Sequence, residues 1–411
     1  MRKIKLGDVL NVKRGMSLSG DYYSETGEII RLTLGNFDYP ACGFKENKSK
    51  SDIYFTGPIR SEFLLKKGDI ITPLTEQVRG LLGNTATIPN DNLYIQSGDI
   101  GLVIPDESKI DKRFAYYLVS SAIVKKQLDA GSQQTKIRHT SPDAIKECIA
   151  WIPQDINKQR RIAKLMDDIN ERISNNNAIN AELEAMAKTM YDYWFLQFEF
   201  PNENGKPYKS SGGKMVYNEE LKREIPEGWE VKSIFDAADV IYGYPLSTER
   251  FTEKDGLPVV RIRDIVDNSV SANTTEEVEN KYLTATKDLL IGMDGNFHMN
   301  FWPRKGDCVN QRIVRVRSNG KASTLQIYFE IYPFIKQREQ NAARSTVGHL
   351  SDKDMKQLRI LITNNESINN TFEDILFKVC LNKKENQELA SLRDFLLPLL
   401  MNGQVGFKEK A

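Results

Sequence analysis

Two long segments of the chain carry apolar residues at alternating intervals of four and three positions, a pattern typical of helices that pack along a seam. The apolar positions of the first segment are Ile162, Met166, Ile169, Ile173, Leu183, Ala187, Met190 and Trp194. Those of the second are Phe372, Ile375, Val379, Leu389 and Leu396. The pattern predicts long helices over residues 154–197 and 364–403. The alternative is that each helix is an ordinary core helix of its own domain.

Both predicted seams are interrupted near the middle by two asparagines. Asn176 and Asn180 lie in the first helix, and Asn382 and Asn386 lie at the corresponding positions of the second. Buried asparagine is costly unless it meets a polar partner. Antiparallel packing would bring the two pairs together and fix the register. We therefore predict an antiparallel two-helix coiled coil, which at about 1.5 Å per residue would hold two domains at most ~60 Å apart.

The rest of the chain is a diverged internal duplication. Four stretches recur in the same order, and the offset between the copies shrinks steadily, as small loop deletions would produce. In the first stretch, Leu6, Asp8, Val12 and Gly15 match Ile234, Asp236, Val240 and Gly243. Later, Gly68-Asp-Ile-Ile resembles Lys287-Asp-Leu-Leu, Ile95-Gln96 matches Asn310-Gln311, and His139 and Ser141 match His349 and Ser351. Two similar domains follow from this duplication.

Each copy has the pattern of a mixed α and β domain. Short β-branched runs such as 69–72, 101–104, 257–262 and 312–316 are separated by Gly, Asn, Asp and Pro turns. Ser141 and Ser351 resemble helix N-caps, and an apolar strand follows each short helix. The fold class is therefore α+β, with two similar mixed α/β domains separated by the coiled coil. The predicted boundaries are 1–153, 154–197, 198–224 (a Gly-, Pro- and Ser-rich linker), 225–363 and 364–403.

Composition narrows the possible functions. Apolar residues make up 40% of the chain and charged residues 27%, as in ordinary globular proteins. No apolar stretch approaches the ~20 residues of a membrane span, and the four cysteines are scattered without a metal-binding spacing. We expect a cytoplasmic protein with reduced cysteines and no membrane partner. The net charge of +1 argues against a protein that coats DNA through charge alone.

Catalytic motifs are missing from the sequence. It has no N-P-P-[YF] or D-P-P-Y run, no phosphate-binding G-x-x-x-x-G-K-[ST] and no H-E-x-x-H. Its three histidines, His139, His298 and His349, are too scattered to predict a metal site. We therefore expect a non-catalytic protein that binds no metal or cofactor itself.

Candidate DNA contacts are denser in the second copy. Segment 301–317 holds Arg304, Lys305, Arg312, Arg315 and Arg317 against a single acid, Asp307. Arginine suits bidentate contacts to guanine, and asparagine or glutamine suits adenine. Asn296, His298 and Asn300 are further candidates on a loop, and Gln311 precedes Arg312. For Arg315 and Arg317, a solvated strand face is an equally good interpretation.

The first copy offers fewer candidates. Gln77 and Arg79 occupy a turn before Gly80, a suitable place for reading bases. Lys13, Arg14, Lys136 and Arg138 are candidates for phosphate contacts, which position a protein on DNA without specifying sequence. For each of these residues taken singly, a solvated surface charge is favoured over a DNA contact.

The central connection resembles that of the specificity subunits of type I restriction-modification enzymes. The similarity lies in Trp194-Phe195, in the run from Phe198 through G-K-P-Y-K-S-S-G-G to Gly213, and in the I-P-x-G-W motif that ends at Trp229. Residues 288–295 followed by Asn310-Gln311-Arg312 resemble the core of that family's target-recognition domain. The first copy departs from this pattern, with residues 75–79 and Ile95-Gln96-Ser97 in its place.

The resemblance, which covers essentially the whole chain, implies a sequence-specific DNA-binding subunit. It implies two target-recognition domains that read a bipartite, asymmetric site on double-stranded DNA. It also implies two adenine methyltransferase subunits as partners, which bind S-adenosylmethionine, and restriction or translocase subunits that accompany them. The competing interpretation is a coiled-coil scaffold that bridges two protein partners without binding DNA.

Overall fold

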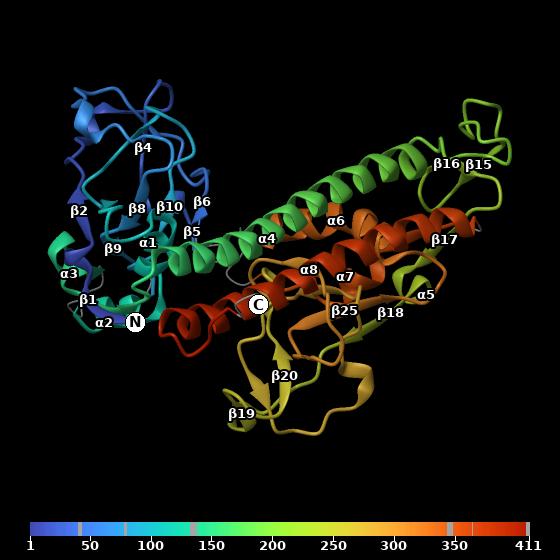
Figure 1. The fold of residues 1–411 in the computed structure, drawn as a ribbon. Coiled ribbons are helices and arrows are strands. Elements are labelled where there is room, and N and C mark those ends of the chain that lie inside the picture. The colour runs from blue at the N-terminus through green and yellow to red at the C-terminus, as the bar shows by residue number, and fades with distance from the viewer. Residues whose placement is uncertain (40–42, 78–79, 132–137, 343–347, 364, 408–411) are drawn as a thin grey trace. The chain divides into compact units, whose positions relative to one another are not determined.

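A computed structural model describes residues 1–39, 43–77, 80–131, 138–342, 348–363 and 365–407. The chain divides into two compact units (Figure 1). The first comprises Met1–Arg172 and Leu389–Ala411, and the second comprises Ile173–Glu388. Each unit therefore takes one copy of the duplication and a part of each long helix.

The first unit is built on two four-stranded sheets. One has the order β10 (Ala86–Thr87), β8 (Ile70–Pro73), β12 (Ile100–Pro105) and β2 (Leu10–Arg14). The other has the order β11 (Tyr94–Ile95), β4 (Ile30–Arg31), β7 (Tyr54–Phe55) and β3 (Tyr23–Ser24). Two-stranded pairs join β1 (Arg2–Lys5) to β14 (Ile149–Ile152), β13 (Arg138–His139) to β9 (Thr75–Glu76), and β5 (Phe37–Asp38) to β6 (Gly43–Phe44). The helices are α1 (Lys112–Val119), α2 (Ala122–Gly131) and α3 (Pro142–Glu147).

The second unit repeats this plan. One sheet has the order β18 (Ala238–Tyr242), β25 (Ile313–Ser318), β22 (Leu289–Gly292) and β23 (Met299–Phe301). The other has the order β19 (Phe251–Thr252), β21 (Asn273–Thr274), β20 (Leu257–Val260) and β24 (Cys308–Val309). The pair β17 (Glu230–Ser233) and β26 (Arg359–Ile362) corresponds to β1 and β14. The helices are α5 (Ile234–Ala237), α6 (Thr324–Ala342) and α7 (Asp352–Gln357).

Matching hydrogen bonds confirm the duplication. Leu6 N–H donates to Cys148 O in the first unit, and Ile234 N–H donates to Leu358 O in the second. Gly68 and Lys287, which the sequence aligned, both adopt a positive φ, at 85° and 77°. Both predicted caps are present, because Ser141 accepts from Ala144 N–H and Ser351 accepts from Asp354 N–H. An apolar strand, β14 or β26, follows each capped helix as predicted.

One step of the sequence alignment is wrong by two residues. Met16 N–H donates to Gln96 O, whereas the matching donor in the second unit, Tyr244 N–H, bonds Val309 O. Gln96 therefore corresponds to Val309 rather than Gln311. The error arose because Gln96 was matched to Gln311 by side-chain type, whereas the backbone equivalence depends on the strand register.

Gly15 and Gly243, the aligned glycines of the two copies, are required by close backbone packing. A Cβ added to Gly15 would lie 2.3 Å from Ser97 O, and one added to Gly243 would lie 2.0 Å from Asn310 O. Only glycine allows such an approach between two backbone segments. The same constraint in both units explains why this position survived the divergence of the copies.

The long helices are α4 (Ile156–Tyr191), which ends in a π-helical turn over Asp192–Leu196, and α8 (Glu366–Met401). In the second unit their asparagines pair as predicted. Asn176 Nδ2 donates to Asn386 Oδ1 at 2.9 Å, and Asn382 Nδ2 donates to Asn180 Oδ1 at 2.8 Å. As residue numbers rise along α4 they fall along α8, so the pairing is antiparallel. The interpretation of two helices in separate cores is therefore wrong.

The helix segments of the first unit continue this pairing with a different polar pair. Arg393 of α8 is buried and donates from Nη1 to Asn170 Oδ1 at 3.0 Å. Ile162, Met166 and Ile169 of α4 are buried, as the seam predicted. Mixed α and β domains and antiparallel long helices confirm the predicted fold class.

The segment predicted as a linker, residues 198–224, is folded. Its strand β15 (Met215–Asn218) pairs with β16 (Arg223–Pro226). The Phe200 ring stacks on both Tyr208 and Trp229, with centroids 4.6 and 4.9 Å away. Gly, Pro and Ser content predicted a linker, and in the structure aromatic packing and a strand pair order this connection.

Candidate nucleic-acid interface

In the second unit, three arginines and several amide or imidazole groups converge around a pocket of about 450 Å³. The lining residues are Arg261, Ile262, Arg263, Asp294, Asn296, His298, Asn310, Arg312 and Ile313. They come from the turn after β20, from the hairpin loop between β22 and β23, and from the turn before β25. Guanidinium, amide and imidazole groups are those that proteins use to contact base edges and phosphates.

The hairpin loop that carries Asn296 is fixed by its backbone and by one buried ring. Gly292 N–H donates to His298 O, which closes the loop across the ends of β22 and β23. Gly295 adopts a φ of 68°, which favours glycine. Phe297 is fully buried, while its neighbour Asn296 is exposed and His298 is half-buried. The buried ring thus anchors a loop whose polar neighbours are available to a ligand.

Asp294 contacts two side chains, of which Arg312 also lines this pocket. Its Oδ1 accepts a hydrogen bond from His349 Nδ1 at 2.7 Å, and its Oδ2 lies 3.4 Å from Arg312 Nε. The Arg312 side chain remains 57% exposed. A nearby pair of groups restrains the second arginine, since Arg261 donates to Ser271 Oγ and lies 3.5 Å from Asp264.

The first unit carries different chemistry at the corresponding place. By backbone register, Thr75 and Asp99 correspond to Asp294 and Arg312. Gln77 is exposed. The buried Glu76 carboxylate beside it accepts three backbone hydrogen bonds, from Gly80, Leu81 and Leu82, at 2.7–3.0 Å. Gln77 and Asn296, selected separately from the sequence, both lie in the loop that follows the shared Thr75 and Asp294 position.

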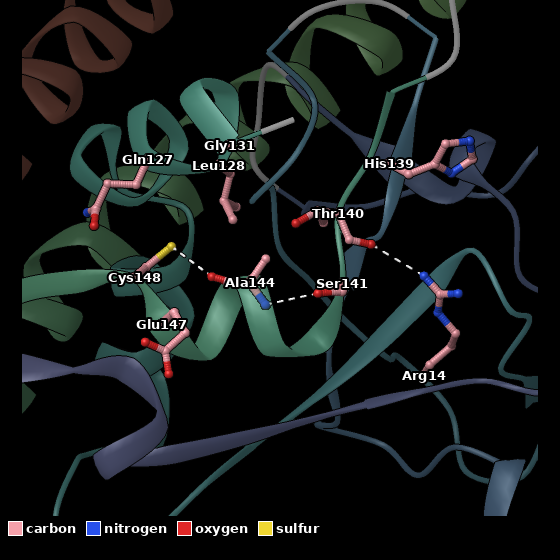
Figure 2. Close-up of a pocket in the computed structure, with 10 residues that line it drawn as sticks. All are labelled: Arg14, Gln127, Leu128, Gly131, His139, Thr140, Ser141, Ala144, Glu147 and Cys148. Carbon is pink, nitrogen blue, oxygen red and sulfur yellow. Dashed lines mark hydrogen bonds between the residues drawn. The ribbon is translucent and has the colours of Figure 1, made fainter. Parts of the chain in front are cut away.

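Arg14 and Arg138, the phosphate candidates of the first unit, lie in different surroundings. Figure 2 shows Arg14 at one side of a pocket of about 680 Å³, where its Nη2 donates to Thr140 O at 3.3 Å. Arg138 is largely buried by ion pairs with Glu76 at 3.0 Å and Asp129 at 2.6 Å. Arg14 is therefore the more accessible. Two other candidates, Arg79 and Lys136, lie outside the described residues.

Several candidates of the second unit make contacts within the protein. Asn300 Nδ2 donates to the carbonyls of Ile265 and Val266, and Asn300 Oδ1 accepts from Lys383. Arg304 pairs with Asp307 at 3.2 Å. These contacts suit a structural role, and DNA binding by Asn300 and Arg304 stays a prediction. Gln311 is exposed and lies next to the pocket residues Asn310 and Arg312.

The interpretation of Arg315 and Arg317 as a solvated strand face is wrong for Arg315. Its side chain is 4% exposed and lies 3.8 Å from Asp288, which is fully buried. Arg317 makes a two-point contact with the same carboxylate, at 2.7 and 2.8 Å. Burial lowers the pKa of Arg315, whereas the hydrogen bond to Asp288 raises the pKa of Arg317. Both arginines therefore belong to the internal packing of the sheet.

Arg261 and Arg263 are pocket residues that the sequence analysis did not select. Arg263 is exposed, and no ion pair engages it among the described residues. The available signal was the pair of arginines at alternate positions directly after the strand β20. It was missed because the two residues approach Arg312 only through the tertiary fold.

Over the described ranges, no group of three or more His, Cys, Asp or Glu side chains could hold a metal ion. No helix in the part of the chain that the structure describes is both long and apolar enough to cross a membrane.

Comparison with known proteins assigns these domains to a family. A family model described as the type I restriction modification DNA specificity domain matches residues 1–185 and 226–391. The MjaIX specificity subunit of Methanocaldococcus jannaschii is 25% identical over 321 residues, which are 75% of this chain and 72% of that protein. The HindI specificity subunit of Haemophilus influenzae is 21% identical over 414 residues, covering 85% and 89%.

A solved structure has the same fold. The S subunit of a type I restriction-modification system from M. genitalium aligns with 97% of this chain and 96% of its own, with a TM-score of 0.55. Sequence identity is 15%. This likeness supports the fold, while the family assignment depends on the sequence matches.

Proposed function

The chain belongs to the type I restriction modification DNA specificity family, and from this premise we propose that its two domains read the two unlike halves of one bipartite DNA site. The family membership makes it a DNA-recognition subunit of a type I system. The proposal adds that the site is asymmetric, with one half read by each unit.

One observation carries this proposal: equivalent backbone positions in the two units present different side chains. The second unit has Arg312 where the first has Asp99. Because base edges are distinguished by donor and acceptor patterns, different side chains at one place select different bases. The surrounding backbone is shared, so both units can approach DNA in the same manner.

We propose that the chain has no catalytic activity of its own. Two adenine methyltransferase subunits would bind it, hold S-adenosylmethionine and methylate the recognised site. Restriction or translocase subunits would act on the same complex. The family assignment supports a recognition role, and the sequence lacks the N-P-P-[YF] and D-P-P-Y motifs of adenine methylation.

The test is to co-express the chain with its methyltransferase subunits and map the methylated adenines in genomic DNA. A two-part motif with unlike halves and a fixed gap is the expected result. The absence of any motif would instead support the coiled-coil scaffold, which the family assignment does not favour. The purified chain alone, supplied with S-adenosylmethionine and DNA, should transfer no methyl group.

A further inference from the structure

Arg312 differs from the neighbouring arginines in how its guanidinium is held. It lies directly before β25, in a turn closed by the hydrogen bond from Ile313 N–H to Asn310 O. Met293 N–H donates to Arg312 O, and this hydrogen bond joins the turn that carries Arg312 to the start of the hairpin loop that carries Asp294. The side chain therefore projects from an ordered position at the end of a strand.

Asp294 forms an ion pair with this guanidinium, and the shortest distance, 3.4 Å, joins its Oδ2 to Nε. Among the described residues, no hydrogen bond engages the two terminal nitrogens of Arg312. Those terminal nitrogens are the pair that binds O6 and N7 of guanine in the major groove. An arginine held through Nε is partly ordered before it meets DNA, which reduces the entropy that binding must remove.

Asp294 is itself held in place. Its backbone pairs with His349, its Oδ1 accepts from His349 Nδ1, and Leu350 N–H donates to Met293 O next to it. The carboxylate thus sits on a short antiparallel bridge between two segments far apart in sequence. It can orient Arg312 without contacting DNA.

We propose that Arg312 reads a guanine in the half-site of the second unit and that Asp294 is its positioning residue. This inference rests on the proposed function and adds the base and the residue pair. The corresponding position of the first unit is Asp99, whose carboxylate would repel that guanine's acceptor edge. The guanine contact therefore belongs to one half-site only.

Two comparisons within the second unit support the assignment. Arg317 donates from both Nε and Nη2 to Asp288, so these two nitrogens are not available to make a two-point contact with a base. Arg263 lines the same pocket without a carboxylate partner, so its exposed guanidinium suits a phosphate, which carries no sequence information. Of these three arginines, only Arg312 combines exposure, an oriented guanidinium and unoccupied terminal nitrogens.

The experiment measures base preference with the complete methyltransferase complex. The wild-type motif is mapped first, and duplexes carrying each of the four bases at every motif position are then methylated in competition. Arg312→Ala should reduce discrimination at one guanine of the second half-site on the order of 10- to 100-fold. Arg312→Lys, which keeps the charge but not the fork, should relax the same position.

Asp294→Ala should relax that position too, by a smaller factor. A merely structural role would reduce methylation at all positions equally, whereas a positioning role changes the preference at one. The half-site of the first unit is an internal control in every assay. Arg250→Ala, an exposed arginine outside the pocket, is the matched surface control and should leave the motif unchanged.

The possible results separate the two claims. If Arg312→Ala and Arg312→Lys leave every base preference intact, or relax a position that is not guanine, the readout proposal is overturned. If Arg312 variants relax a guanine while Asp294→Ala does not, Asp294 is not the positioning residue. A wild-type complex that yields no motif would overturn the proposed function itself, which is a different outcome.

Discussion

Each unit has a carboxylate shortly after the matching strand, β8 or β22, but the two carboxylates have different partners. In the first unit it is Glu76, next to Gln77, and in the second it is Asp294, whose position matches the neighbouring Thr75. Glu76 accepts three backbone hydrogen bonds and pairs with the largely buried Arg138. Asp294 instead binds two side chains, His349 and the exposed Arg312. The first arrangement stabilises the main chain of a loop, whereas the second restrains an exposed arginine, the residue proposed to read a base. Specificity can thus diverge while the backbone is kept.

A second contrast lies inside the sheets and gives the largest predicted effect. Asp288 is fully buried beside Arg315 and Arg317, whereas the matching Asp69 has Leu102 and Ile104 at the equivalent strand positions. Asp288→Ala would leave Arg315 buried without its carboxylate, at a cost of roughly 3–5 kcal/mol. Asp69→Ala removes only a hydrogen bond from Lys66 N–H, for about 1 kcal/mol.

Urea unfolding of the full chain, with hydrogen exchange resolved for each unit, measures both variants. The second unit should lose far more stability from its aspartate than the first unit loses from Asp69. Equal losses would mean that the two sheets are stabilised alike, contrary to their side-chain contacts.

The asparagine seam of the second unit gives the next largest effect. Asn176→Leu with Asn180→Leu would remove the hydrogen bond that Asn382 donates to Asn180 and those that Asn176 donates to Asn386 and Glu385, a loss of about 1–3 kcal/mol for each polar group left unsatisfied. Adding Asn382→Leu and Asn386→Leu should recover much of this stability, because an all-apolar seam needs no polar partners. Register should stay loose in that quadruple variant.

Thermal unfolding measures the loss and recovery. Distances between spin labels on α4 and α8, both placed within the second unit, report the register. A quadruple variant with one sharp distance distribution would show that the asparagines do not set the register.

The sequence predicted features whose physical cause is local or periodic. The seam asparagines, the Ser141 and Ser351 caps and the equivalence of Gly15 and Gly243 each follow from spacing along the chain. Arg315 was misjudged because alternation along a strand does not reveal that Asp288 is buried beside it. Arg261 and Arg263 were missed, and Asp294 was not linked to Arg312, because these contacts join segments distant in sequence.

A smaller effect is expected at Gln77 and Asn296, the exposed amides in the corresponding loops of the two units. Gln77→Ala should relax base preference only in the half-site of the first unit, and Asn296→Ala only in that of the second. Loss of one amide contact to adenine should lower the discrimination between bases by roughly 1 kcal/mol or more. A loss of about 1.4 kcal/mol would lower the ratio of methylation of the preferred base to that of the others about tenfold. Methylation of duplex libraries by the complete complex measures each preference. A variant that altered the opposite half-site would break the assignment of one unit to each half.

The caps of α3 and α7 give the smallest expected difference. Ser141 receives one hydrogen bond, from Ala144 N–H at 3.0 Å, so Ser141→Ala should cost about 0.5–1 kcal/mol. Ser351 is part of a reciprocal box in which Asp354 accepts from both Ser351 N–H and Ser351 Oγ. Ser351→Ala should therefore cost more, about 1–2 kcal/mol.

The two serines should also differ in acid. Burial opposes the charge on Asp354, but hydrogen bonds from Ser351 and the ion pair with Arg338 hold its pKa below the usual 3.8. A lowered carboxyl pKa contributes stability above pH ~4, and that stability is lost as the pH falls through the folded-state pKa. Ser351→Ala raises this pKa, so acid unfolding of the second unit should begin at higher pH. Ser141→Ala should leave the pH at which the first unit begins to unfold in acid unchanged. An equal shift of this pH in both units would show that the Asp354 carboxylate is not the cause.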